Sequence, residues 1–427
     1  MSNQATQKRA VVVLLACILF NLTIGVLYAW SVLKSKMTSP IVEGGWEWTA
    51  SQSGMPYTFA ILFTALFVLV GGRIQDKLGP RWVVTAGALF TGAGLILSGF
   101  VGNSVIGVTF CFGVITGIGI GLGYSSVTPP ALKWFHPSKK GLISGLIVGG
   151  FGLAAVYIAP LSNTLLNGFG IEKTMLYLGI GALVIGAAAA QFVRNPPPDH
   201  IPAVPAKIKQ AATAAKPTAT VNFSPKEMMK TTRFCLMFVI FLVTASVGLM
   251  FIGNMTKIAR TQADISDTAV LAALVAFLAI TNSGGRVVGG MLSDKIGRTP
   301  ALYMVLIIQM LNMAAFTFYS TLPMVIVGII GVGFCFGTLL SVFPAMTADQ
   351  FGLKNFGVNY GIMFMAWGFS GLAAPVIADY FYDLNGNFNT AYIICSVMMA
   401  VMIVVNFLLT KNVKALAARA ASESDSD

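Results

Sequence analysis

About twelve runs of roughly 20 mostly apolar residues, separated by short polar connectors, constrain this chain more than any other feature. A helix of that length crosses the roughly 30 Å apolar core of a bilayer. A hydrophobic content of 56% with only 10% charged residues excludes a soluble globular protein. The ten-residue alternating segments of a membrane β-barrel are absent. The sequence therefore predicts an all-α polytopic membrane protein with twelve transmembrane helices.

The predicted spans fall into two groups of six. They cover residues 10–33, 50–71, 81–101, 105–130, 141–165 and 172–193, and then residues 231–259, 267–291, 298–319, 323–347, 355–382 and 386–410. We expect an N-terminal six-helix bundle in residues 1–193 and a C-terminal one in 231–410. A cytoplasmic linker rich in Pro, Ala and Lys, 194–230, joins them. The tail, 411–427, is predicted to be cytoplasmic and disordered.

The net charge of +12 reflects how Lys and Arg are distributed between the two sides of the membrane, and it does not indicate a nucleic-acid partner. If the N-terminus is cytoplasmic, 21 of the 27 Lys and Arg residues fall in segments on the inner side and five on the outer side, with Arg286 inside a span. This asymmetry is the positive-inside bias. It predicts a multi-pass protein of the cytoplasmic (inner) membrane with both termini cytoplasmic and with membrane lipid around it.

Two pairs of segments repeat between the halves. "GGRIQDKLGPR" from Gly71 matches "GGMLSDKIGRT" from Gly289 at an offset of 218, and "FHPSKKGLISG" from Phe135 matches "FGLKNFGVNYG" from Phe351 at an offset of 216. Each half has an even number of spans, so both halves enter the membrane from the same side. The sequence therefore predicts a parallel repeat, with two pseudo-symmetric bundles related by an axis normal to the membrane.

Residues for catalysis, cofactor binding or metal binding are missing from the sequence pattern. The two histidines, His136 and His200, fall in predicted cytoplasmic loops, and the spans hold no cluster of Cys or acidic residues. No phosphate-binding glycine loop is present. We expect no enzyme activity, no cofactor and no metal site.

Arg286 lies inside the eighth predicted span, in "NSGGRVVGGMLSDKIGR". A charge in hydrocarbon costs about 3 kcal/mol on insertion scales, so such residues face a cavity or a partner. Arg286 is eight residues before Asp294, which places its backbone about 12 Å inside that loop. Its side chain should lean toward the bilayer centre, since helical side chains point toward the N-terminus. We therefore predict a functional role in preference to snorkelling to the membrane edge.

The expected partner of Arg286 is the substrate. No Asp or Glu lies in the apolar interior of a predicted span, and Asn282, one turn earlier on the same face, cannot neutralise a guanidinium. A planar guanidinium holds a carboxylate with two parallel hydrogen bonds. A single buried cation favours a substrate with one negative charge, a monocarboxylate.

Aromatic residues within the spans are candidates for the walls of a binding cavity. Tyrosine hydroxyls within lipid need hydrogen-bond partners, which ranks the tyrosines above the other aromatic residues. The candidates are Tyr28, Tyr124, Phe336, Tyr360 and Trp367.

The repeated G-x-x-x-D-x-x-G loop resembles the signature loop of the major facilitator superfamily. The resemblance implies two six-helix bundles around a central site and alternating access by rocking of the halves. In that family the acid of the loop caps a helix end and its basic residues tie neighbouring helices. By this resemblance the gating residues are Asp76, Arg81, Asp294 and Arg298.

Four segments are similar to a branch of that superfamily, the oxalate/formate antiporters and, more distantly, the monocarboxylate transporters. They are "GVLYAW", "GLGYSSVTPPALKWF", "NSGGRVVGGMLSDKIGR" and "NYGIMFMAWGFSG". The resemblance implies carboxylate binding between the halves by an arginine of the eighth span, here Arg286. A lysine that the oxalate carriers have in the eleventh span is replaced by Trp367, which argues against oxalate as substrate.

Together these observations predict a secondary transporter of a small monocarboxylate, lactate or pyruvate, moved with a proton by alternating access. Arg286 holds the carboxylate, and Asn282 and tyrosine hydroxyls hold the remaining oxygens. The candidates for proton coupling are Asp264, Asp267 and Asp379. Two alternatives are a carboxylate exchanger of the oxalate/formate type and a non-transporting membrane sensor on the same fold. We expect the protein to be monomeric.

Overall fold

The computed structural model describes residues 3–197, 200 and 222–424, and every regular element in those ranges is helical. Ten of the described helical segments are long and apolar enough to cross a membrane. One of the ten, α7, contains 51 residues and is interrupted at Gly170, so it crosses twice. A further helix of 30 residues, α14 (Phe356–Asn385), completes the twelve crossings that the sequence predicts.

The first half of the chain contains seven α-helices joined by short 3-10 and π-helical segments. They are α1 (Asn3–Ile24), η1 (Gly25–Ala29), α2 (Trp30–Met37), η2 (Ile41–Glu43), α3 (Ala50–Leu78), α4 (Pro80–Phe100), α5 (Val105–Val108), the π-helical η3 (Thr109–Thr116), α6 (Gly117–Trp134), η4 (Pro137–Lys139) and α7 (Lys140–Ala190). The first crossing runs continuously through α1, η1 and α2, and the fourth runs through α5, η3 and α6.

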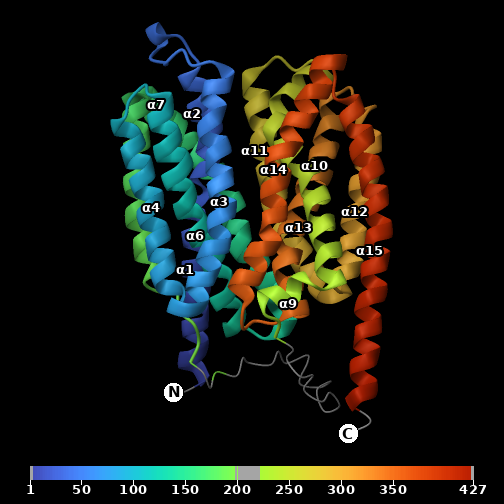
Figure 1. Ribbon diagram of the computed structural model, residues 1–427. Helices are drawn as coiled ribbons and strands as arrows, with labels where there is room; N and C mark the ends of the chain where they lie inside the picture. Colours follow the sequence, from blue (N-terminus) through green and yellow to red (C-terminus); the bar gives the residue numbers. More distant parts are fainter. Residues whose placement is uncertain (1–2, 198–199, 201–221, 425–427) are drawn as a thin grey trace.

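The second half begins with a short helix that precedes its six crossings. Its helices are α9 (Pro225–Met229), α10 (Thr232–Ala263), α11 (Thr268–Ile296), α12 (Arg298–Phe316), α13 (Leu322–Phe351), α14 and α15 (Asn389–Ser424). Figure 1 shows the helices of the two halves as two bundles standing side by side. The start of α1, the end of α15 and α9 lie at one end of the molecule, which we call the linker end.

Local sequence signals set several of these helix boundaries. The hydroxyl of Thr49 accepts a hydrogen bond from the Gln52 N–H (3.2 Å), and the Gln52 side chain accepts one from the Thr49 N–H (2.8 Å). This capping box satisfies donors that the first turn of α3 leaves open. Pro80 occupies the first turn of α4, where its missing N–H costs nothing.

The repeat found in the sequence has a matching backbone geometry. Gly79, between α3 and α4, has φ +86° and ψ 161°, and Gly297, between α11 and α12, has φ +95° and ψ 160°. Positive φ strains residues that carry a Cβ, so glycine is the natural residue at both turns. Gly170 (φ +78°, ψ −179°) makes the break inside α7 in the same way.

The C-terminal segment differs from the expectation of a disordered tail. α15 continues as a helix to Ser424, through most of residues 411–427. The segment "KNVKALAARAA" contains mainly Ala, Lys, Leu and Arg, which have the highest helix propensities, and it continues a helix that is already nucleated. The low hydrophobicity of this segment therefore did not predict its backbone conformation.

The end of the linker is anchored on the second half. The Phe223 N–H donates to the Phe351 carbonyl (3.0 Å), and the Asn355 and Asn359 side chains donate to the Phe223 carbonyl (3.0 and 3.1 Å). The Arg233 guanidinium lies 4.5 Å from the centre of the Phe223 ring. The chain is thus fixed to the turn between α13 and α14 before α10 begins.

Candidate functional site

The two halves meet at the linker end through two pairs of glycines. A Cβ placed on Gly72 of α3 would lie 2.1 Å from the Gly357 carbonyl oxygen of α14, and one on Gly290 of α11 would lie 2.2 Å from the Gly141 carbonyl oxygen of α7. No real Cβ approaches a backbone oxygen so closely, so only glycine permits these contacts. In the sequence repeat Gly72 is equivalent to Gly290, and Gly141 is equivalent to Gly357. We call these four residues the glycine seam.

The acids of the repeated loops accept hydrogen bonds across the seam. The Asp294 carboxylate accepts from the backbone N–H groups of Gly141 (2.9 Å) and Leu142 (2.8 Å), in the first turn of α7. The Asp76 carboxylate accepts from the Val358 N–H (3.4 Å), in the first turn of α14. A carboxylate at a helix N-terminus satisfies open donors and interacts favourably with the helix dipole. Each acid therefore caps a helix of the opposite half.

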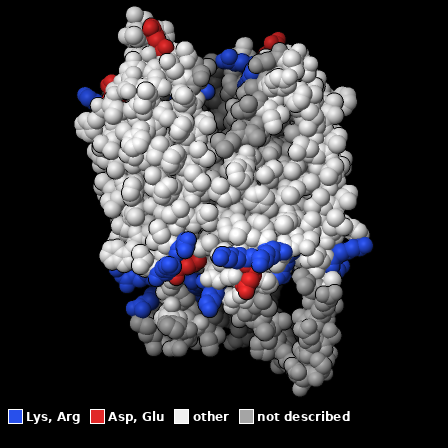
Figure 2. Space-filling model, in the orientation of Figure 1, with Lys and Arg blue, Asp and Glu red and all other residues white. Residues whose placement is uncertain are grey.

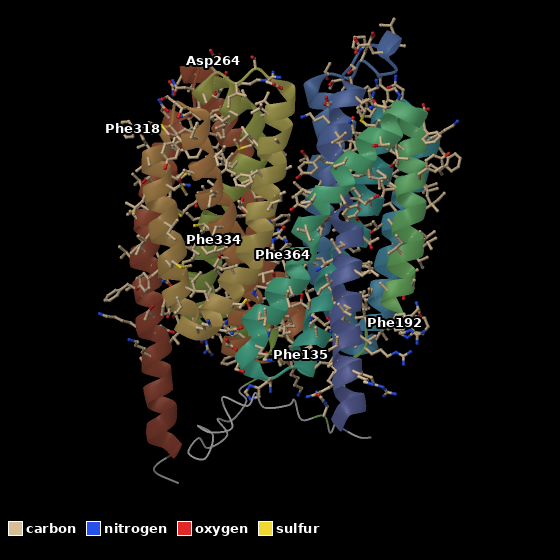
Figure 3. The ribbon with its side chains drawn as sticks, turned by 180° about the vertical axis from the view of Figure 1, so that it is seen from behind. Phe135, Phe192, Asp264, Phe318, Phe334 and Phe364 are labelled. Atoms are coloured by element: carbon tan, nitrogen blue, oxygen red, sulfur yellow. The ribbon has the colours of Figure 1, made fainter. Side chains whose placement is uncertain are left out.

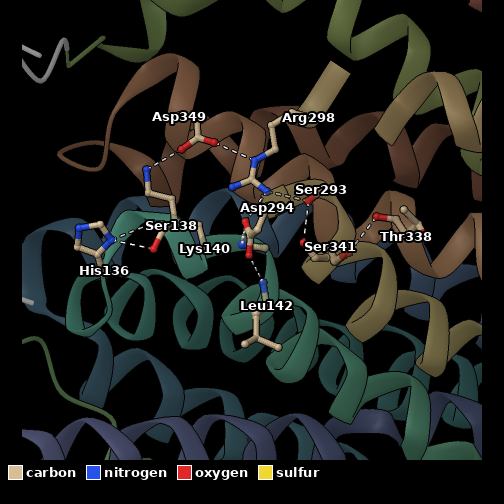
Figure 4. Close-up of polar contacts among 12 residues, drawn as sticks. His136, Ser138, Lys140, Leu142, Ser293, Asp294, Arg298, Thr338, Ser341 and Asp349 are labelled. Carbon is tan, nitrogen blue, oxygen red and sulfur yellow. Dashed lines mark hydrogen bonds and ion pairs between the residues drawn. The ribbon is translucent and has the colours of Figure 1, made fainter. Parts of the chain in front are cut away.

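Ion pairs reinforce only the second copy of this arrangement among the described residues. Arg298, the first residue of α12, pairs with Asp294 near the end of α11 (2.6 Å) and with Asp349 near the end of α13 (2.9 Å). Asp349 also pairs with Lys140 (2.7 Å) at the start of α7, so the network crosses between the halves (Figure 4). Several coupled charges with restricted exposure hold more firmly than an isolated surface pair.

Arg81 of the first copy has a different partner. Its Nε donates to the Gln191 side-chain oxygen (3.0 Å), which ties α4 to the end of α7 within the first half. In the repeat, Arg298 aligns with Pro80 and not with Arg81, so the two arginines leave their helices in different directions. The two copies of the loop are therefore alike in their acids and unlike in their arginines.

A cavity lies between the halves, and its lining includes Arg286, one helical turn from Gly290 of the seam. Its free volume, about 40 Å³ for the centres of water-sized spheres, has room for about three waters or a small organic ion. Among the residues that the structure describes, Arg286 is the only charged one in the lining. The lining residues are Leu27, Tyr28, Tyr57, Ile61, Thr64, Ile120, Tyr124, Phe151, Leu249, Ile252, Arg286, Phe336, Leu340, Phe364 and Trp367.

Arg286 is 2% exposed, and its described partners are all uncharged. Its Nε donates to the Asn282 side-chain oxygen (3.0 Å), and its Nη1 donates to the backbone carbonyl of Val148 on α7, in the opposite half. No described acid forms an ion pair with it. A buried cation held only by dipoles remains incompletely compensated, because the loss of hydration costs several kcal/mol.

Aromatic rings form a continuous wall from one half to the other. The Phe151 ring centre lies 5.7 Å from that of Tyr28 and 5.5 Å from that of Tyr124. Tyr124 faces Phe364 of the second half at 5.1 Å, and Phe364 stacks on Trp367 at 4.9 Å. Phe364 lies near mid-height, where the halves face each other (Figure 3). Contacts between rings fix their orientation around the cavity.

Two buried donors in this region lack a partner among the described residues. They are the Trp367 indole N–H and the Tyr360 hydroxyl. The Tyr360 hydroxyl is close enough to that of Tyr124 to interact with it, but the geometry falls short of a hydrogen bond. An unpaired buried donor costs about 1–3 kcal/mol, so these groups favour a ligand that brings acceptors.

The structure brings most of the predicted binding residues together. Arg286, Tyr28, Tyr124, Phe336 and Trp367 line the cavity. Two others lie beside it: Asn282 holds Arg286, and Tyr360 adjoins Tyr124 without entering the lining.

The predicted proton-coupling residues lie elsewhere. Asp264, at the C-terminal end of α10, is exposed at the end of the molecule opposite the linker (Figure 3). Asp267 is exposed just before α11 and accepts from the Val270 N–H (3.4 Å). The side chain of Asp379 lies outside the described part of the structure. Neither described acid lines the cavity.

The sequence reasoning missed a row of lining residues on α3. Tyr57, Ile61 and Thr64 follow one another at spacings of four and three, which places them on one helix face. The Thr64 hydroxyl donates to the Gly117 carbonyl (3.2 Å), which leaves its oxygen able to accept. The spacing of the polar residues Tyr57 and Thr64 was the only hint in the sequence. Whether their helix face points toward the cavity depends on tertiary packing, which the sequence does not give.

The surface is hollowed between the halves on the side away from the linker, as Figure 2 shows. At the linker end the same view shows a belt of basic side chains and a few acidic ones across the bundles. The cavity therefore lies between a closed seam at one end and a depression at the other.

Comparison with known proteins places this architecture among membrane transporters. A sequence model described as Major Facilitator Superfamily matches residues 10–343 and 310–425. The chain is 28% identical to an uncharacterized MFS-type transporter, YhjX of Escherichia coli (85% of this chain, 86% of that protein), and 26% identical to the oxalate:formate antiporter of Oxalobacter formigenes (90% and 87%). It is 26% identical to apicoplast pyruvate carrier 1 of Toxoplasma gondii (69% and 63%).

A solved structure agrees with the fold. The transporter FucP of E. coli, in the outward conformation, superposes with a TM-score of 0.66 at 15% identity, covering 92% of this chain and 97% of FucP. At this identity the likeness concerns the fold alone.

Proposed function

The chain belongs to the major facilitator superfamily, and from this premise we propose that it is a secondary transporter of small monocarboxylates, lactate or pyruvate, moved together with a proton. The linker end is cytoplasmic in this proposal, and the protein lies in the inner membrane, because the basic residues concentrate in segments at that end. The hollow on the opposite side is then the route by which substrate enters from outside.

The observation that carries the proposal is Arg286, which has no ion-pair partner and no charged neighbour among the described residues of a small cavity. A carboxylate would supply the missing negative charge and accept two parallel hydrogen bonds from the guanidinium. The limited volume favours an acid of a few carbon atoms. A second carboxylate would find no second cation among the described lining residues, and burying it unpaired would be costly. These features support a monocarboxylate over a dicarboxylate.

The remaining groups have distinct roles in this proposal. Asn282 orients the guanidinium through its Nε, so it acts on the substrate through Arg286. The aromatic wall excludes water around the bound anion, which strengthens its electrostatic attraction to the cation. The glycine seam closes the cytoplasmic route while the site loads from outside, and alternating access requires this seam to part.

Transport into proteoliposomes tests the proposal. A gradient of one pH unit supplies about 1.4 kcal/mol, so a one-to-one symporter should concentrate labelled pyruvate or lactate about tenfold. Uptake should fall to equilibration when the gradient is dissipated. If neither acid is taken up at any pH, by gradient or by exchange, the proposed function is wrong.

The similarity to the oxalate:formate antiporter favours a second candidate, a carboxylate exchanger. Vesicles preloaded with unlabelled anion distinguish the two mechanisms. An exchanger requires the internal anion and ignores the proton gradient, whereas a symporter responds to the gradient without any internal anion.

Replacing both Asp264 and Asp267 by asparagine tests their proposed part in proton coupling. Both carboxylates are exposed at the end where external protons would enter, so coupling through them predicts that the double variant loses gradient-driven accumulation of lactate while it keeps counterflow exchange. Replacing Glu43, another exposed acid, in η2, by glutamine is the matched control. Accumulation that persists at the wild-type level in the double variant would remove both aspartates from the coupling mechanism.

A further inference from the structure

We propose that Trp367 determines substrate specificity by donating its indole N–H to an oxygen on carbon 2 of the acid, so that the site selects 2-oxo and 2-hydroxy monocarboxylates over unsubstituted ones. This inference rests on the proposed function and adds a second recognition point to it. It begins from a buried donor that the fold leaves without a partner.

The Trp367 ring is held in place independently of any ligand. It stacks on Phe364 with an angle of 22° between the planes and a centre separation of 4.9 Å. Its backbone carbonyl accepts from the Ser370 hydroxyl (2.8 Å), as expected inside α14. A fixed ring presents its N–H at a defined position, so little side-chain entropy is lost when an acceptor binds.

The donor and the cation belong to different helices of the same cavity. Arg286 lies on α11 and Trp367 on α14, and both contribute to its lining. In this proposal the acid places its carboxylate on the guanidinium and its second carbon toward the Trp367 side of the cavity. The indole offers one neutral hydrogen bond there. This suits a carbonyl or hydroxyl oxygen, which carries no charge that needs neutralising.

The other walls explain why a neutral acceptor is preferred to a larger polar group. Ile120, Leu249, Ile252 and Leu340 present only hydrocarbon to the cavity. Such walls suit the methyl carbon of pyruvate or lactate and penalise any additional polar atom that finds no partner. An acid without an oxygen on carbon 2 fits the same space, but it leaves the indole N–H unpaired.

Binding of matched acids to the purified transporter tests the inference. Pyruvate and propionate have three carbons each and differ at carbon 2, and titration calorimetry in detergent avoids the passive permeation of propionic acid. We expect the wild-type protein to bind pyruvate about tenfold more tightly than propionate. Trp367→Phe, which keeps an aromatic ring and removes the N–H, should weaken pyruvate binding about tenfold and change propionate binding less than twofold.

Two further variants keep the outcome interpretable. Trp82→Phe is the matched control, since Trp82 is 67% exposed on α4 and should affect neither acid. Trp367→His retains an N–H donor and should preserve part of the preference for pyruvate, also where the phenylalanine variant folds poorly. Equal weakening of both acids in the phenylalanine variant, or equal binding of both by the wild-type protein, would overturn the inference and leave the proposed function standing. Wild-type protein that binds neither acid would overturn both.

Discussion

Replacing Arg286 by glutamine is expected to abolish monocarboxylate uptake and to weaken pyruvate binding by at least about a hundredfold. The guanidinium is the only charged group among the described lining residues, and two charge-assisted hydrogen bonds to a carboxylate contribute about 1.5–3 kcal/mol each. Glutamine can still donate to the Asn282 side-chain oxygen or to a carbonyl, so the fold should remain intact. Titration calorimetry and proteoliposome uptake measure the two effects separately.

Lysine at the same position separates charge from geometry. Arg286→Lys keeps a positive charge and loses the planar fork that suits a carboxylate. It also loses the Nε contact to Asn282. We expect its affinity for pyruvate to lie between the affinities of the wild-type protein and the glutamine variant. Full affinity in the lysine variant would contradict recognition through two parallel hydrogen bonds.

A matched control for the arginine variants lies at the linker end. Arg233 is also partly buried and hydrogen-bonded to an amide side chain, Gln350, but it does not contribute to the cavity lining. Arg233→Gln should leave pyruvate affinity within about twofold of the wild-type value, as expected for distant sites that share no partner. A large loss of affinity in this control would show that removing any buried arginine disturbs the bundle.

The fold was predictable because the signals that define it are local or periodic. Each crossing is a continuous apolar run, and the two-fold relation follows from segments that match at offsets of 218 and 216. The positive φ angles of Gly79 and Gly297 occur where those segments place equivalent glycines. The helical continuation of α15 was not predicted, because the polar composition of the tail was taken to indicate disorder. Ala and Lys also favour a helix.

The site was predictable only in part, because one sequence does not give the rotation of each helix. Arg286 stands out by its energetic cost alone, wherever its helix packs. The carbonyl of Val148, which accepts from its Nη1, belongs to the opposite half and has no side-chain signature. Tyr57 and Thr64 were missed for a related reason, since their helix also has faces toward lipid and toward other helices.

Adding a single methyl group to the glycine seam is expected to impair closure of the linker end. In Gly290→Ala the new Cβ would lie 2.2 Å from the Gly141 carbonyl oxygen, so α7 and α11 must separate. Overpacking of this kind costs about 1–3 kcal/mol, which shifts the ratio of closed to open molecules by about five- to 150-fold. Uptake should fall accordingly, because alternating access needs both states.

The matched control is Gly181→Ala, on the same helix as Gly141. A Cβ at Gly181 meets no atom within 4 Å. Alanine favours a helix by about 1 kcal/mol relative to glycine at either site, so helix propensity cannot explain a loss in one variant alone. We expect Gly181→Ala to transport at the wild-type rate.

Distances between spin labels at the linker end give a direct measure of the closure. Lys77 of the first half and Lys295 of the second are both exposed there, and cysteines at these positions can be labelled after the exposed Cys235 is replaced by serine. Gly290→Ala should lengthen the distance between the labels, and Gly181→Ala should leave it unchanged. If the alanine at position 290 leaves both the distance and the uptake at wild-type values, the glycine contact does not control closure. The seam would then be only a consequence of packing, and the ion pairs of Asp349 would have to keep the halves together.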